Sequence, residues 1–183
     1  MRGLLSLSDL MNLSQSHGMD TLALTDVNGM WGFIRFVQHC KDAGIRPIAG
    51  TNLITENDDV ILLAENQYGY ENMCRAVSAV HDNSKQSITD ILEKQLAGLF
   101  VLAHKGSTLN KLINIIPYTH LFLELRPGMQ ESYMQKLAKK LKLEMVVTGD
   151  VYFRSQSDHD AHITLRAIEK NTTLKQLDIA ECK

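Results

Sequence analysis

Two aspartates and a histidine stand where predicted strands end, and side chains of these types are able to hold a cation. Asp26 closes the run TLALTD, His104 closes LFVLAH, and Asp150 follows EMVVTG. In parallel α/β folds the carboxyl ends of the strands meet at one edge, where the working groups of such proteins collect. Because metal ions bind several oxygen and nitrogen ligands at once, these residues predict a candidate metal site at a common mouth.

The residues beside these three make a metal site less favourable. Val27 offers no donor atom, and Asn52 and Tyr152, which follow other strand ends, are poor ligands. Three ligands are few for a stable centre. Hydrogen bonding of the aspartates to loop amides is therefore the simpler role. A structural role is also favoured for His104, because no nucleophile that it could serve as a base is identifiable.

A second cluster of metal-binding residue types lies near the end of the chain. His159 and His162 are three residues apart on a predicted helix and could contact one zinc ion. Asp158 and Asp160 equally suit the N-terminus of that helix, where the macrodipole favours negative charge. Four lysines form a basic helix end that could meet a phosphate backbone or remain a solvated surface; they are Lys136, Lys139, Lys140 and Lys142.

The elements that must position these residues alternate between apolar runs of strand length and helical patterns. Strands are predicted at 21–26, 46–54, 60–65, 99–104, 120–125 and 144–148. Helices are predicted at 8–17, 29–44, 70–81, 88–97, 108–116, 130–142 and 158–170. The helix at 29–44 is expected to bury Phe33, Ile34, Val37 and Cys40 on one face. This alternation favours an α/β fold with a parallel sheet or barrel, and six strands are too few for a complete eight-stranded barrel.

The composition fits an ordinary globular protein. The 183 residues are 44% hydrophobic and 22% charged, and the net charge of −2 gives no overall attraction to nucleic acid. No apolar run approaches the roughly 20 residues of a membrane span. Three widely spaced cysteines, Cys40, Cys74 and Cys182, form no Cys-x-x-Cys motif. Without a recognisable leader, they indicate reduced thiols and a cytoplasmic protein.

Six segments in collinear order carry a family resemblance. They are 25–32 (TDVNGMWG), 43–50 (AGIRPIAG), 69–75 (GYENMCR), 123–125 (LEL), 147–153 (VTGDVYF) and 158–173 (DHDAHITLRAIEKNTT). Together they resemble the PHP (polymerase and histidinol phosphatase) domain, most closely the one that opens the alpha subunit of bacterial DNA polymerase III and its error-prone relatives. The last segment resembles the connection toward the polymerase palm. The resemblance implies a distorted PHP-type (β/α)7-like barrel.

Several residues depart from the metal-binding pattern of that family. Members with a live metal site open with a His-x-His strand, whereas this chain begins beyond that point, near Leu4. We therefore expect an incomplete barrel that lacks its first strand. The resemblance places Val27 and Tyr152 where the family has histidines, and Asn52 where it has a glutamate. Loss of these donors leaves too few ligands for a multinuclear centre.

Other positions keep residue types that bind metals. The resemblance places Asp26, His81 and Asp150 at ligand positions of the family, and His104 near a further one. For His81, which ends an apolar helical face, a role at the helix C-terminus is the simpler expectation. We predict no tightly bound metal cluster, no cofactor in this domain and no phosphoesterase activity.

The resemblance also implies a function and partners. It suggests a PHP-like domain over residues 1–153 and, over 154–183, a connecting helix and tail toward a polymerase core. The parent protein would be a DNA-directed DNA polymerase that uses Mg²⁺ and binds DNA, with this domain as a scaffold. In the family this domain can also dock a proofreading exonuclease subunit.

Two other functions remain open from the sequence. One is an active metal-dependent phosphoesterase or exonuclease, and the other is a stand-alone interaction protein. An unclosed barrel would leave strand edges with unpaired amides. We therefore expect either a homodimer of this chain or coverage of the edge by the N-terminal helix.

Overall fold

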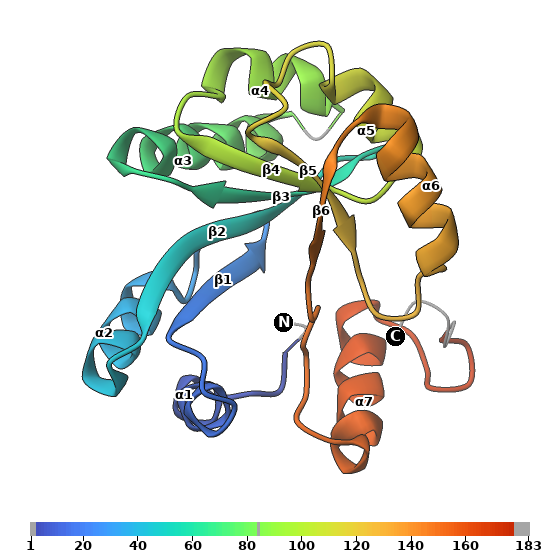
Figure 1. The fold of residues 1–183 in the computed structure, drawn as a ribbon. Coiled ribbons are helices and arrows are strands. Elements are labelled where there is room, and N and C mark those ends of the chain that lie inside the picture. Colours follow the sequence, from blue (N-terminus) through green and yellow to red (C-terminus); the bar gives the residue numbers. More distant parts are fainter. Residues whose placement is uncertain (1–2, 84, 178–183) are drawn as a thin grey trace.

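Six strands form one curved sheet whose order in space is their order in the chain (Figure 1). The structure is a computed structural model that describes residues 3–83 and 85–177. The strands are β1 (Thr21–Val27), β2 (Arg46–Ile54), β3 (Asp59–Ala64), β4 (Leu99–Ala103), β5 (Leu121–Leu125) and β6 (Glu144–Val147). The predicted strands are therefore all present, and their bounds differ from the expectation by one residue at most.

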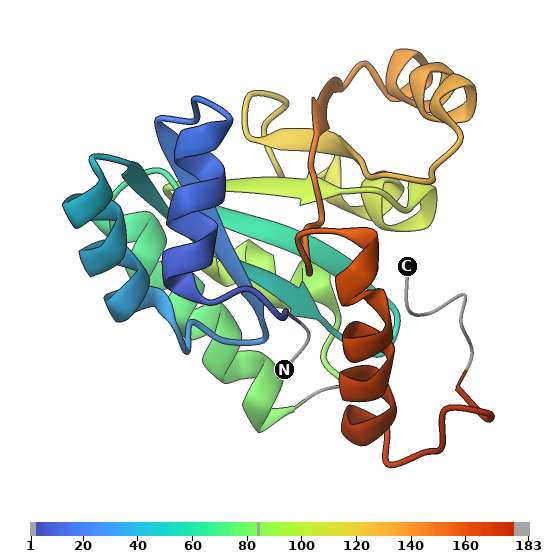
Figure 2. The ribbon, with the colours of Figure 1, turned by 90° about the horizontal axis from the view of Figure 1, so that it is seen from below.

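Within the described part of the chain, seven α-helices accompany the sheet. They are α1 (Leu7–Ser16), α2 (Phe33–Ala43), α3 (Gln67–Asp82), α4 (Ile88–Gln95), α5 (Gly106–Leu112), α6 (Glu131–Leu141) and α7 (His159–Glu169), the last preceded by the short 3₁₀ turn η1 (Gln156–Asp158). Helices α2 to α6 surround the outside of the curved sheet, whereas α1 and α7 lie on the side where the sheet is open (Figures 1 and 2). No described helix is both long and apolar enough to cross a membrane.

The direction of β3 corrects the expectation of a parallel sheet. β1 and β2 are parallel, as are β4, β5 and β6, but β3 runs antiparallel to both of its neighbours. The reason is the length of the connection, because only residues 55–58 join β2 to β3, whereas a parallel crossover needs a dozen or more. The turn is fixed by the hydrogen bond that Thr55 N donates to the carbonyl of Asp58 at 2.9 Å. The start of β3 consequently lies at the same edge as the ends of the other strands.

The sheet does not close on itself, which agrees with the expected incomplete barrel. Strands β1 and β6 end the sheet and fan apart in Figure 1. The chain near its N-terminus instead contacts the segment after β6, where Leu4 N donates to the carbonyl of Tyr152 at 2.8 Å.

The core fills the space between the sheet and its outer helices. The larger apolar cluster joins β2 to β5 with α3 to α6, and Leu53, Leu62 and Leu123 are fully buried in it. A smaller cluster ties α1 and α2 to β1 through Met11, Phe36 and Cys40. One expectation is wrong here, because Ile34 is 76% exposed and Phe36 takes its place in the core. Cys40 and Cys74 form no disulfide, and Cys182 lies outside the described residues.

Candidate functional site

Asp26 ends β1 with its side chain occupied by the backbone that leads into α2. Its Oδ2 accepts a hydrogen bond from Gly32 N at 3.1 Å. Thr51, opposite Asp26 in the register, is fully buried and donates through Oγ1 to the carbonyl of Asp26 at 3.0 Å. Asp26 therefore makes the loop-amide contact that the sequence favoured for it.

His81 reaches the same loop from the last turn of α3. Its Nε2 lies 2.7 Å from the carbonyl oxygen of Asn28, and its ring meets Trp31 edge-on at 6.3 Å between centroids. Asn28 has a positive φ of 45° and holds the loop to β2, because its side chain bonds both the N–H and the carbonyl of Ile54. The contacts of His81 are thus to a neighbouring loop rather than to the end of its own helix.

Val27 and Asn52 sit opposite each other in the β1–β2 register. The Asn52 side chain is buried, and with its amide nitrogen turned toward β3 it donates to Asp59 Oδ1 at 2.6 Å and to the carbonyl of Val60 at 3.2 Å. Asn52 therefore supports a carboxylate at the start of β3, where a charged ligand would repel it.

A buried ion pair lies at the end of β5. Glu124 is fully buried, and its Oε2 accepts a hydrogen bond from Arg126 Nε at 2.8 Å. Its other oxygen accepts from Thr148 Oγ1, just after β6, at 2.6 Å. Residues two apart in a strand point to the same face, which is why Glu124 and Arg126 meet. We call Glu124, Arg126, Asp59, Thr148 and His104 the mouth cluster.

The guanidinium of Arg126 faces further negative charge. Its Nη1 lies 3.6 Å from Asp59 Oδ2, and the side chain is only 13% exposed. Burial lowers the pKa of Arg126, but the charges of Glu124, Asp59 and Asp150 outweigh this and raise the pKa above its usual value. Arg126 therefore stays cationic within the mouth cluster.

The carboxyl of Glu124 is held in its charged form by its neighbours. Burial raises its pKa, but hydrogen bonding from His104 and Thr148 together with the positive charge of Arg126 brings the pKa below the usual value. His104 Nδ1 lies 3.5 Å from Glu124 Oε2, which is a long contact, and this nitrogen has no closer hydrogen-bond partner. His104 thus lies against a buried carboxylate, at the end of β4.

The predicted residues near the C-terminus contact one another through their rings. The ring of Tyr152 stacks on His162 at 5.5 Å between centroids, and Phe153 contacts both His162 and His159. These aromatic contacts explain the positions of both histidines. The lysines that end α6 are exposed.

The residues at the mouth do not fit a multinuclear metal centre. Within residues 3–83 and 85–177, no group of three or more histidine, cysteine or acidic side chains is placed to hold one metal ion. The guanidinium of Arg126 contacts the carboxylates of Glu124 and Asp59, and its positive charge would repel a metal ion beside them. Val27 supplies only apolar surface at the adjoining strand end.

Sequence reasoning missed Arg126, Glu124 and Asp59 as members of the site. A signal for Glu124 was present, because a single charge inside the apolar run LFLEL requires a buried partner, and Arg126 stands at the matching i+2 position. Asp59 could be assigned to the site only if the direction of β3 were known, and the apolar pattern of a strand does not show its direction.

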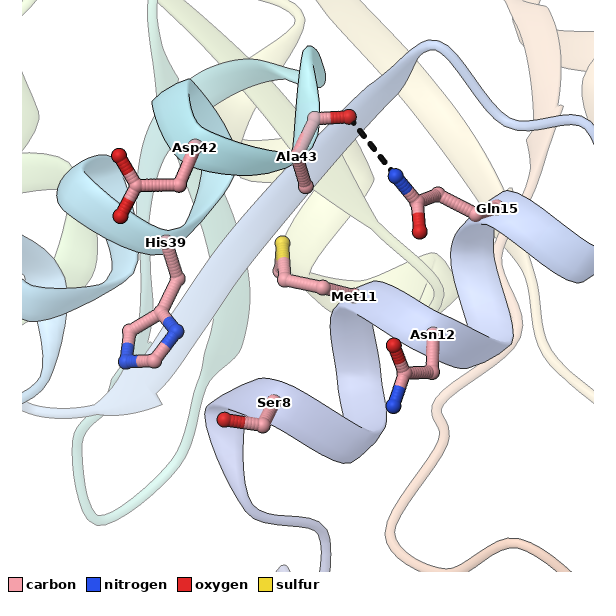
Figure 3. A pocket seen from close by; sticks show the side chains of 7 residues that line it. All are labelled: Ser8, Met11, Asn12, Gln15, His39, Asp42 and Ala43. Carbon is pink, nitrogen blue, oxygen red and sulfur yellow. Dashed lines mark hydrogen bonds between the residues drawn. The ribbon is translucent and has the colours of Figure 1, made fainter.

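A surface pocket elsewhere is formed by α1 and α2 (Figure 3). It is lined by Ser8, Met11, Asn12, Gln15, His39, Asp42 and Ala43, and Gln15 Nε2 donates to the carbonyl of Ala43 at 2.9 Å. This bond joins the two helices. No strand end contributes to the pocket, so it is separate from the mouth cluster.

The solved structures that resemble this chain share its fold. An amidohydrolase from Chromobacterium violaceum has a TM-score of 0.57 and 11% identity over 85% of each chain. A two-domain Bacteroides vulgatus protein containing a predicted PHP-like metal-dependent phosphoesterase has a TM-score of 0.59 and 14% identity, over 94% of this chain and 52% of that one. At these identities the likeness establishes the fold alone.

Curated relatives are bacterial DNA polymerases. DNA polymerase III subunit alpha of Pasteurella multocida is 27% identical over 94% of this chain and 18% of its own length. The Staphylococcus aureus subunit is 23% identical over 93% of this chain and 16% of its own length. An error-prone DNA polymerase of Symbiobacterium thermophilum is 27% identical over 93% of this chain and 20% of its own length. The chain thus spans at most about a fifth of the length of these relatives. The PHP domain model matches residues 1–143. With that match over most of its length, the chain belongs to the PHP domain family.

Proposed function

We propose that this chain is the opening PHP domain of a bacterial DNA polymerase of the DNA polymerase III alpha type, and that it serves as a scaffold without phosphoesterase activity. The homology to PHP regions of such polymerases supports the first part. The observation that carries the second part is the guanidinium of Arg126, which lies among the carboxylates at the strand ends. Asp26 and His81, two of the residues that the resemblance places at ligand positions, make contacts to backbone.

The proposal divides the chain into a PHP-like domain over 1–153 and a connection over 154–183. The family match ends at residue 143, before this division. Beyond it, α7 forms its own small apolar cluster, in which Ala167 and Leu177 are buried. A separate cluster of this kind suits a segment that leads to another domain.

The activity and partners of the whole protein follow as part of the proposal. The parent would be a cytoplasmic DNA-directed DNA polymerase that uses Mg²⁺ in a polymerase core outside this chain. DNA would be bound through the parent protein. A proofreading exonuclease subunit is the further partner that the family relationship suggests.

A hydrolysis assay on the 183-residue chain tests the scaffold role. The chain is incubated with p-nitrophenyl phosphate and with single-stranded DNA, in Mn²⁺, Zn²⁺ or Mg²⁺ and in chelator. We expect no product above a protein-free blank, because the ligand set at the mouth is incomplete. Hydrolysis that depends on a metal, stops with chelator and is lost in Asp26→Asn but retained in the exposed control Asp20→Asn would contradict the proposal.

A further inference from the structure

We infer that Arg126 is the fixed cation of the mouth cluster and takes, with its guanidinium, the charge-balancing place that a divalent ion would take among these carboxylates. This inference rests on the proposed absence of a metal centre and deepens it, because it names the residue that replaces the ion. The inference goes beyond the loss of metal ligands, since it assigns to Arg126 the positive charge that balances the carboxylates of the mouth cluster.

The contacts of Arg126 support this assignment. Its Nε donates to Glu124 at 2.8 Å and its Nη1 lies 3.6 Å from Asp59, so that one guanidinium joins β5 to the start of β3. Asp150, in the loop after β6, adds a third negative charge near it. A carboxylate as buried as Glu124 needs an opposite charge, because an unpaired ion in the interior costs several kcal/mol.

The spacing of the acidic groups suits a guanidinium better than an ion. Metal ligands must converge to within about 2.0–2.6 Å of one point, and no three acidic or imidazole side chains among the described residues do so. A planar guanidinium instead offers donors on several sides and bonds carboxylates that stand further apart. Glu124 and Asp59 lie on different sides of it in this way, one at Nε and one at Nη1.

Arg126 also differs from a bound ion in its permanence. It is covalently part of the chain and remains charged at any physiological pH, so it neither dissociates nor deprotonates. The stability of a domain built in this way does not depend on the metal supply. Thr148 of the mouth cluster donates to the carboxylate of Glu124, and Asn52, outside the cluster, donates to that of Asp59.

Thermal unfolding of the 183-residue chain tests the inference. Arg126→Met keeps the length of the side chain but removes its charge, and we expect its Tm to fall by roughly 10 °C, because one partner of a buried pair is left uncompensated. The matched control Arg75→Met removes an exposed arginine whose ion pair with Glu71 lies on the surface of α3, and its Tm should stay close to that of the wild type. Equal Tm values for the two variants would overturn the inference.

A double variant separates charge balance from packing. Glu124→Gln added to Arg126→Met removes the uncompensated carboxylate, and we expect it to recover at least half of the lost Tm. If Arg126→Met alone fails to fold, the double variant should still fold. A double variant that is no more stable than Arg126→Met, or that also fails to fold, would show that the charge of Arg126 is not what the mouth requires.

Metal uptake completes the test and distinguishes this inference from the proposed function. We expect the wild-type chain to retain no Mn²⁺ or Zn²⁺ in equilibrium dialysis with elemental analysis, and its Tm to be the same with either ion or with chelator. An ion held at the mouth without hydrolysis would overturn the role of Arg126 and leave the scaffold role standing. Metal-dependent hydrolysis would overturn both.

Discussion

Glu124 is the central residue of the mouth cluster, because it carries a full charge inside a strand that is otherwise apolar. Three groups from three elements converge on it: Arg126 beyond β5, Thr148 beyond β6 and His104 beyond β4. A carboxylate of this kind costs free energy to bury unless each oxygen accepts hydrogen bonds. Glu124 therefore links the ends of three strands through one side chain.

The lowered pKa of Glu124 predicts a specific dependence of stability on pH. A carboxyl whose pKa is lower in the folded than in the unfolded chain stabilises the fold above the unfolded value, near 4.5, and loses this contribution as the pH falls through the folded value. We expect Glu124→Gln to lower the free energy of unfolding by about 2 kcal/mol at pH 7, with the difference from wild type shrinking below about pH 4.5. Urea denaturation from pH 7 to pH 3 measures this.

The control for this experiment is Glu93→Gln, which changes an exposed glutamate of α4. Its unfolding free energy should follow that of the wild type within about 0.5 kcal/mol at every pH. A Glu124→Gln difference that is constant across the pH range would show that the carboxyl contributes through shape rather than charge.

Sequence patterns predict the single residues of the site unevenly. Asp26 makes the backbone contact that its place at a strand end suggested. His81 could not be placed, because the loop that it contacts is 53 residues away in the chain. Arg126 stands two residues after Glu124 and directly before the Pro127-Gly128 turn, and nothing local in the sequence shows that its side chain also reaches Asp59.

At the scale of elements, a close approach of two glycines determines how the start of α3 packs against the start of β4. A Cβ at Gly69, in the first turn of α3, would overlap the carbonyl oxygen of Gly98, just before β4. That carbonyl is already fixed, because it accepts a hydrogen bond from Glu65 N at 2.9 Å. Gly98 itself has a φ of +73°, a conformation that glycine adopts without strain.

Gly69→Ala is expected to destabilise the chain by about 3 kcal/mol, because the backbone of Gly98 cannot move aside without breaking its hydrogen bond with Glu65, just after β3. Gly106→Ala is the matched control, since a Cβ there finds Leu137 at an ordinary 3.6 Å and Gly106 begins α5, where alanine is the better helix former. Urea midpoints measure both. A Gly69 variant as stable as the Gly106 variant would contradict this account.

Periodicity predicts the elements themselves but not their directions. Continuous apolar runs such as VILLA indicate a buried strand, and the ends of β1 to β6 agree closely with that reading. The pattern is the same for a strand of either direction, so the reversal of β3 depends on the four-residue connection before it. The exposure of Ile34 has a similar cause, because the rotation of α2 is set by packing against α1 through Met11 and Phe36.

The whole molecule is an open half-barrel with two free sheet edges. β1 and β6 each pair on one side only among the described strands. Helix α1 packs against α2 and the side chains of Leu22 and Leu24, so it covers part of β1 from one face. An exposed strand edge presents unpaired backbone groups that favour pairing with another chain.

We expect the 183-residue chain to form a dimer at micromolar concentration, as measured by light scattering after size exclusion. Val147, 74% exposed at the end of β6, lies on a free edge, and Val147→Lys should shift the equilibrium toward monomer. Val151→Lys, at a similarly exposed valine beyond the strand, should leave it unchanged. A wild-type chain that is monomeric at every concentration would show that the free edges do not drive association.

The sequential order of the strands bears on how this chain assembles during synthesis. Each strand pairs with the strand that precedes it in the sequence, so the strands are synthesised in the same order in which they lie in the sheet. Every described strand pairs with its neighbours in the sequence, so the chain closed at each step is no longer than the segment between β3 and β4, which limits the entropic barrier. The sheet can grow outward from β1 without rearrangement of the strands already paired. The last strand to be added is β6, which brings Thr148 to Glu124.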